Sequence, residues 1–131
     1  MMDSGAAKHV TNRGTVPHVP IVPSPGSLRN QSFISATGGR SPNEGEQHLQ
    51  GCTDAGTPVD MNIQITDVNK SLFSVAEITE RGNRVIFGRG GGVIHNVKSN
   101  RLTPFRRTGG VYALDIWIPK EPCKWGFGGQ E

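Results

Sequence analysis

Glycine and proline interrupt this sequence so often that the chain is restricted to short strands, turns and irregular loops. Its 131 residues include 18 glycines and 9 prolines, and four of these prolines lie between positions 17 and 25. That spacing excludes helix and central strand from this region. A chain of this length is sufficient for one domain and too short for two ordinary ones. We therefore expect a single, mostly β domain.

The clearest secondary-structure signal is a strict alternation of apolar and polar residues at positions 59–66. A period of two indicates a half-buried strand. Its apolar face would consist of Val59, Met61, Ile63 and Ile65. The other extended segments are expected at residues 28–36, 44–50, 84–87, 93–97 and 111–118.

Glycine-bearing turns join these segments into hairpins. Gly38-Gly39 separates the first two of the extended segments, and Gly90-Gly91-Gly92 separates the next two. A short loop with glycine between extended segments is typical of a β-hairpin. We interpret the glycine triplet as a hairpin turn rather than as a phosphate-binding loop, because a single copy stands between two apolar strands.

Apolar residues at 72, 75 and 78 follow helical spacing. Ser71 is a candidate N-cap, and Gly82 stands where a helix needs a left-handed residue after its last turn. The pattern predicts one short helix at about residues 72–81.

The net charge of +3 comes entirely from the C-terminal half of the chain, where four basic side chains gather without an acid among them. A basic cluster of this kind can steer a protein toward phosphate. No nucleic-acid-binding module accompanies it, so we interpret it as a solvated face and do not expect this domain to bind nucleic acid. The cluster consists of Lys98, Arg101, Arg106 and Arg107.

Cysteine and histidine spacing does not predict a metal site. Cys52 and Cys123 are far apart, and none of the four histidines stands beside a cysteine. We expect two reduced thiols, no metal and no cofactor.

The sequence also lacks the signals that direct a chain to membranes or to secretion. No apolar run approaches the roughly 18 residues that a membrane span needs. The N-terminus lacks the basic-then-apolar pattern of a signal peptide. We therefore expect an intracellular protein, in the cytoplasm, with no membrane partner.

Asp3-Ser4-Gly5 is the tripeptide whose chemistry stands out. An aspartate at a loop tip presents a carboxylate, the following hydroxyl can bond to a partner loop, and glycine allows the backbone to approach closely. Two such carboxylates side by side share one proton, which suits activation of water for peptide hydrolysis. An ordinary Asp-x-Gly turn is the alternative interpretation of the tripeptide alone. Asp54-Ala55-Gly56 lacks the hydroxyl and is not taken as a second site.

Three stretches in order resemble the protease region of Copia-type retrotransposon Gag-Pol polyproteins. The first is Asp3-Ser4-Gly5-Ala6, which resembles the D-[ST]-G-A loop of that family. The second is the apolar segment 72–82, which ends in glycine and is followed by a β-hairpin, and the third is the segment 109–114 with sequence Gly-Gly-Val-Tyr-Ala-Leu. The resemblance covers roughly residues 3–118.

The resemblance implies a mostly β, retropepsin-like single-lobe aspartic protease fold. It implies that Asp3 is catalytic, that the Ser4 hydroxyl links two active-site loops, and that Gly5 lies behind them. It also implies an aspartic endopeptidase that cleaves polyprotein peptides and is active only as a homodimer with two Asp3 carboxylates. A flap over the bound peptide is implied at Ala36, Thr37, Gly38 and Gly39, for which an ordinary tight turn is the alternative.

Retropepsins place an apolar strand before the catalytic aspartate, whereas only Met1 and Met2 precede Asp3. We therefore expect a retropepsin-like domain at residues 1–118 that lacks its first strand, in a fragment truncated at its N-terminus. A flexible tail is expected at residues 119–131. The alternative function is that of an inactive retroelement remnant that keeps the fold as a binding or structural domain.

Overall fold

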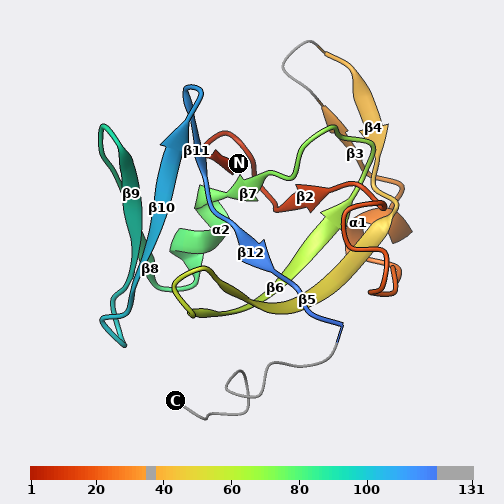
Figure 1. Cartoon of the computed structure of the whole chain (residues 1–131). Coiled ribbons are helices and arrows are strands. Elements are labelled where there is room, and N and C mark those ends of the chain that lie inside the picture. Colours follow the sequence, from red (N-terminus) through yellow and green to blue (C-terminus); the bar gives the residue numbers. More distant parts are fainter. Residues whose placement is uncertain (35–37, 121–131) are drawn as a thin grey trace.

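A computed structural model describes residues 1–34 and 38–120, and their fold is mostly β. Two of the sheets have four strands each, and Figure 1 shows them on opposite sides of the molecule with β7 and α2 between them. In chain order the elements are β1 (Met2–Asp3), β2 (Val10–Thr11), α1 (Pro25–Leu28), β3 (Ser32–Ile34), β4 (Arg40–Pro42), β5 (Gly45–Thr53), β6 (Pro58–Ile65), β7 (Phe73–Ser74), α2 (Val75–Glu80), β8 (Asn83–Phe87), β9 (Gly91–Asn96), β10 (Leu102–Thr108), β11 (Val111–Ala113) and β12 (Ile116–Trp117).

The first large sheet has the strand order β12-β5-β6-β2 and is built around the long hairpin of β5 and β6. These two strands are antiparallel and pair from Gly45 opposite Ile65 to Cys52 opposite Pro58. The alternation predicted for residues 59–66 is confirmed up to Ile65, because Met61, Ile63 and Ile65 are buried while the residues between them are exposed or half-buried. Thr66, expected on the polar face, lies beyond the end of β6 and is buried.

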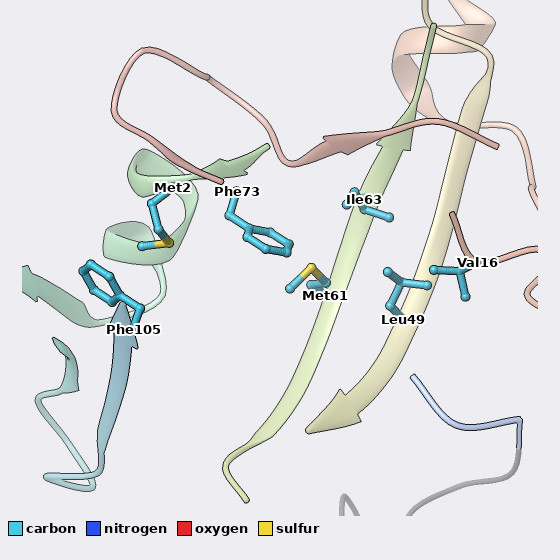
Figure 2. Close-up of a cluster of buried hydrophobic side chains, with 7 residues drawn as sticks. All are labelled: Met2, Val16, Leu49, Met61, Ile63, Phe73 and Phe105. Carbon is cyan, nitrogen blue, oxygen red and sulfur yellow. The ribbon is translucent and has the colours of Figure 1, made fainter. Parts of the chain in front are cut away.

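The core lies between this sheet and the shorter strands that cover it. Figure 2 shows its seven side chains, with those of Phe73 and Met61 pointing toward one another. The cluster draws on β1, β5, β6, β7 and β10 and on one loop, so segments from the whole described chain meet there. Its members are Met2, Val16, Leu49, Met61, Ile63, Phe73 and Phe105.

The second large sheet has the order β11-β10-β9-β8 and consists of consecutive antiparallel neighbours. The predicted hairpin around the glycine triplet is confirmed as β8 and β9. Phe87, Phe105 and Tyr112 meet edge to face, with ring centres 4.8–5.8 Å apart. Such contacts between aromatic edges and faces stabilise the sheet beyond the area they bury.

The predicted helix begins later than expected. Residues 72–81 follow helical spacing, but Phe73 and Ser74 form β7, which pairs in parallel with β1. The N-cap is therefore Ser74, whose Oγ accepts the backbone N–H of Glu77 at 3.1 Å. Ser71 is not the cap, since its hydroxyl bonds to that of Thr11 at 2.7 Å. The predicted helix end is confirmed by Gly82, which has φ of +85°.

The proline-rich region contains a helix that the sequence analysis excluded. The short α1 starts at Pro25, where the missing N–H costs nothing because the first helical residues have no intrahelical acceptor. Ser24 and Ser27 cap it reciprocally through side chain and backbone. Residues 1–34 and 38–120 therefore contain two short helices rather than one, and Leu28 belongs to α1 rather than to a strand.

The first hairpin is shorter than predicted and has a different second strand. The prediction paired residues 28–36 with residues 44–50, whereas β3 pairs with β4. Residues 45–50 instead form part of β5, whose partner is β6. The backbone N–H and C=O groups along the edge of the long strand β6 need partners, and the similarly long antiparallel strand β5 supplies them.

The predicted strand at 111–118 is two strands in different sheets. β11 pairs with β10, and β12 pairs with β5. The break falls at Leu114 and Asp115, so this short segment links the two sheets. The expected apolar face is nevertheless confirmed, because its members all pack against the core: Tyr112, Leu114, Ile116 and Ile118. Beyond Lys120 the predicted tail lies outside the described residues.

Gly51 permits the close approach of β12 to β5. A Cβ at Gly51 would overlap the carbonyl oxygen of Trp117 and lie 2.7 Å from Cδ1 of Ile118. We expect Gly51→Ala to lower the free energy of unfolding by about 1–3 kcal/mol, because strand β12 must shift. Urea denaturation monitored by circular dichroism measures this change.

Gly90→Ala is the matched control for this measurement. A Cβ at Gly90 would meet nothing within 4 Å, so the same glycine-to-alanine change tests only the general effect on the unfolded chain. Equal destabilisation by both substitutions would contradict the packing of β12 on β5.

Candidate functional site

The turn formed by Asp3, Ser4 and Gly5 follows directly from β1. One carboxylate oxygen of Asp3, Oδ1, accepts the backbone N–H of Gly5 at 2.8 Å. Asp3 is half-buried, whereas Ser4 and Gly5 are exposed. A Cβ at Gly5 would lie 3.3 Å from the same carboxylate oxygen, so glycine leaves room for this close contact. The three predicted catalytic residues thus form one local unit.

Strand β1 places this turn beside the start of α2. In the parallel pair, Met2 lies opposite Phe73 and Asp3 lies opposite Ser74. Met2 and Phe73 are both buried in the core, which anchors the strand that carries Asp3. The aspartate therefore occupies a defined position, opposite the N-cap of α2.

A group of buried polar contacts fixes the segment that follows the turn. The hydroxyl of Ser74 donates to the carbonyl oxygen of Ala6 at 2.7 Å. The backbone N–H of Ser74 donates to Nδ1 of His9 at 2.8 Å, and the backbone N–H of His9 donates to Oε1 of Glu77 at 2.9 Å. Residues 6–9 are therefore bonded to β7 and α2 at three points.

The sequence analysis did not single out His9, Ser74 or Glu77 as site residues. His9 appeared as one of four scattered histidines. Its partner Ser74 lies 65 residues further along the chain, so no local spacing connects the two. The parallel pairing of β1 with β7 and the bridge between Val10 and Leu72 bring them together.

His9 has an unusual environment for a titratable group. Only 4% of its surface is exposed, and the ring of Phe73 lies edge-on at 6.0 Å. Burial lowers the pKa of His9, Glu77 counteracts this shift, and Arg81 and Lys8 add to the lowering. Because Nδ1 accepts a hydrogen bond, the ring is neutral with its proton on Nε2, which lies 3.8 Å from Oε2 of Glu77.

A cavity of about 570 Å³ lies beside this group, between the two large sheets. His9 and Phe73 contribute to its wall, with apolar side chains that include Met61, Ile78 and Ile94. Among the described residues, two further cavities of about 550 and 480 Å³ are present. Asp3 lines none of these three.

Two of the four predicted flap residues, Gly38 and Gly39, lie just before β4, which pairs with β3. Ile34 pairs with Arg40 across this hairpin, and Figure 1 shows the hairpin projecting from the body of the molecule. Gly38 has φ of +88°, a conformation that glycine adopts without strain, and both Gly38 and Gly39 are exposed. The predicted flap residues Ala36 and Thr37 lie outside the described residues.

The basic cluster is partly occupied by contacts within the protein. Arg106 forms an ion pair with Asp115, and the guanidinium of Arg107 lies 5.8 Å from the centre of the Tyr112 ring. All four members of the cluster, Lys98 and Arg101 included, are nevertheless exposed.

Comparison of the chain with protein-family models, with curated proteins and with solved structures finds no match. Within residues 1–34 and 38–120, no three His, Cys, Asp or Glu side chains are grouped closely enough to hold a metal ion. No helix in that part of the chain is long and apolar enough to cross a membrane.

The neutral state of His9 makes stability depend on pH in a defined direction. An unfolded histidine has a pKa of about 6.5, and burial lowers the pKa in the folded protein. The contribution of His9 is therefore complete above about pH 6.5 and is lost as the pH falls below it. Urea denaturation from about pH 7 to pH 5 should show a falling free energy of unfolding.

Two substitutions test whether His9 causes this pH dependence of the free energy of unfolding. His9→Asn removes the titration and should flatten this pH dependence, whereas His18→Asn should leave it unchanged, because His18 is exposed. Parallel curves for the wild type and His9→Asn would assign the pH dependence to other groups.

Proposed function

We propose that this chain is an aspartic endopeptidase of a retroelement polyprotein, active as a homodimer in which each copy contributes Asp3. The observation that carries the proposal is the geometry of the Asp3 turn. Its carboxylate is held by the N–H of Gly5 at 2.8 Å, at the end of a strand paired with the strand that enters α2. The order of the Copia-like motifs supports the same function.

The turn is suited to pairing with a second copy of itself. Ser4 and Gly5 are exposed, so the Ser4 hydroxyl is available to bond to the partner's turn. A two-fold axis would bring the two Asp3 carboxylates together, since the same surface of both copies meets at such an axis. The other Asp-x-Gly turn, at residues 54–56, connects β5 to β6 and carries no such hydroxyl.

The chemistry follows from two adjacent carboxyl groups that share one proton. The ionised group takes a proton from water as the water oxygen attacks the peptide carbonyl carbon. The protonated group donates its proton to the carbonyl oxygen, which gives a tetrahedral diol. Collapse of the diol breaks the C–N bond, and a proton passes to the leaving nitrogen. Neither a metal ion nor a covalent intermediate is needed.

An extended peptide is the proposed substrate. Peptides in extended form bind by adding main-chain hydrogen bonds to strand edges. The hairpin of β3 and β4 is a two-stranded sheet with exposed residues along it, which supports a role as the flap over such a peptide.

Asp3→Asn tests the enzymatic proposal. Removal of the shared-proton pair should reduce cleavage of dye-quenched casein to the uncatalysed background between about pH 4 and pH 7. Asp54→Asn is the matched control, since it changes the aspartate of the other Asp-x-Gly turn and should retain the wild-type rate. Equal rates for the wild type and Asp3→Asn would remove Asp3 from the mechanism.

Sedimentation equilibrium tests the dimer. We expect the wild type to dimerise and Ser4→Ala to raise the dimer dissociation constant about fivefold or more, because each turn loses a hydrogen bond to its partner. A monomer at all concentrations would contradict the shared active site. A folded dimer that cleaves nothing would favour the inactive remnant instead.

A further inference from the structure

The segment that follows the candidate active-site turn depends on one buried imidazole. Ser74 bonds to this segment through both its hydroxyl and its backbone N–H, and the second of these bonds ends on Nδ1 of His9. His9 is 4% exposed and Ser74 is fully buried. Water therefore does not readily replace either partner if the bond breaks.

We propose that His9, Ser74 and Glu77 are positioning residues that hold the Asp3 turn in place, and that protonation of His9 releases it. The catalytic consequence rests on the proposed function, whereas the structural coupling does not. None of the three residues is proposed to touch the substrate.

The direction of the switch follows from the hydrogen-bond roles. Nδ1 of His9 accepts the N–H of Ser74 at 2.8 Å, so it carries no proton in this structure. A doubly protonated imidazolium has donors at both ring nitrogens. Its Nδ1–H would face the N–H of Ser74, donor against donor, and the bond would be lost.

The charges around His9 set the balance between the neutral ring, which accepts the Ser74 N–H, and the protonated ring, which cannot. Glu77, on α2, faces the ring at 3.8 Å and favours the protonated form. Arg81, at the end of α2, and Lys8, on the segment of His9 itself, oppose it. Burial against the edge of the Phe73 ring opposes it as well. The neutral, bonded state therefore prevails at neutral pH, and acid favours release.

Ser74 connects the bond to His9 with the turn that carries Asp3. Ser74, which bonds to His9, is the residue opposite Asp3 in the β1–β7 pair. The same serine holds the carbonyl oxygen of Ala6 at 2.7 Å, and Ala6 follows Gly5 directly. A shift of Ser74 consequently acts on the turn from both of its ends.

NMR of the intact chain tests the coupling without any activity. We expect the amide resonances of Ser74 and Gly5 to titrate with the same midpoint as the Cε1–H resonance of His9. In His9→Asn, whose amide oxygen can replace Nδ1 as acceptor, these two amides should show no such titration. In His18→Asn, a change at an exposed histidine, both amides should titrate as they do in the wild type.

Two results would overturn the proposal. One is a Gly5 amide that does not follow the titration of His9, and the other is an unchanged titration of that amide in His9→Asn. If His9→Asn fails to fold, as circular dichroism would show, Glu77→Gln provides the test. It keeps an oxygen for the N–H of His9 but removes the negative charge, so the shared midpoint should move to lower pH. An unmoved midpoint would count against the proposal.

Cleavage kinetics test the effect of the same coupling on activity. The value of kcat for casein should fall in acid with the same midpoint as the titration of His9. This acid-side decrease in kcat should be absent in His9→Asn and should move to lower pH in Glu77→Gln. His9→Phe, which fills the site without an acceptor, should lower kcat about tenfold or more at neutral pH while KM changes little. A wild type that cleaves nothing overturns the proposed function alone, because the NMR result decides the coupling independently.

Discussion

The parallel pairing of β1 with β7 is the interaction on which the rest of this structure depends. It consists of only two residue pairs, Met2 with Phe73 and Asp3 with Ser74. The first pair buries two large apolar side chains in the core, and the second sets the aspartate opposite the N-cap of α2. Packing and candidate chemistry therefore share one short ladder, and a change to either residue pair affects both.

The large hairpin of β5 and β6 supplies the surface on which that ladder rests. Its buried face packs against Phe73 through Met61 and against Val16 through Leu49. Glycine at position 51 lets β12 approach the outer edge of β5. Because β12 continues directly from the second sheet, this contact also joins the two sheets along the chain.

The buried polar groups near the turn explain how an exposed site acquires a defined position. Ser4 and Gly5 face solvent, and exposed turns have few packing contacts of their own. The turn is instead held by the buried residues next to it, because Ser74 and His9 are buried and bonded to one another. A buried polar contact is costly to break, since a partner left without its bond loses solvation as well. The proposed response to acid follows from this arrangement, because one of its bonds ends on a ring nitrogen that can be protonated.

Local sequence determined the elements whose signals lie within a few residues. The alternation from Val59 onward specified β6, and Gly82 specified the end of α2. The Asp3 turn also followed from its own tripeptide, while its assignment to a Copia-like protease stays a prediction. Each of these features depends on a repeat or on backbone freedom that can be recognised without knowledge of distant segments.

Tertiary structure alone decided where distant segments meet. Helical spacing extends back to Leu72, yet Phe73 and Ser74 became a strand because β1 offered hydrogen bonds that a helix start would leave unmade. The extended segment 111–118 was divided between two sheets for the same reason, since each half found a different partner. His9 became buried only because Ser74, 65 residues away, received it. Pairing across such separations depends on the whole fold, and local periodicity carries no information about it.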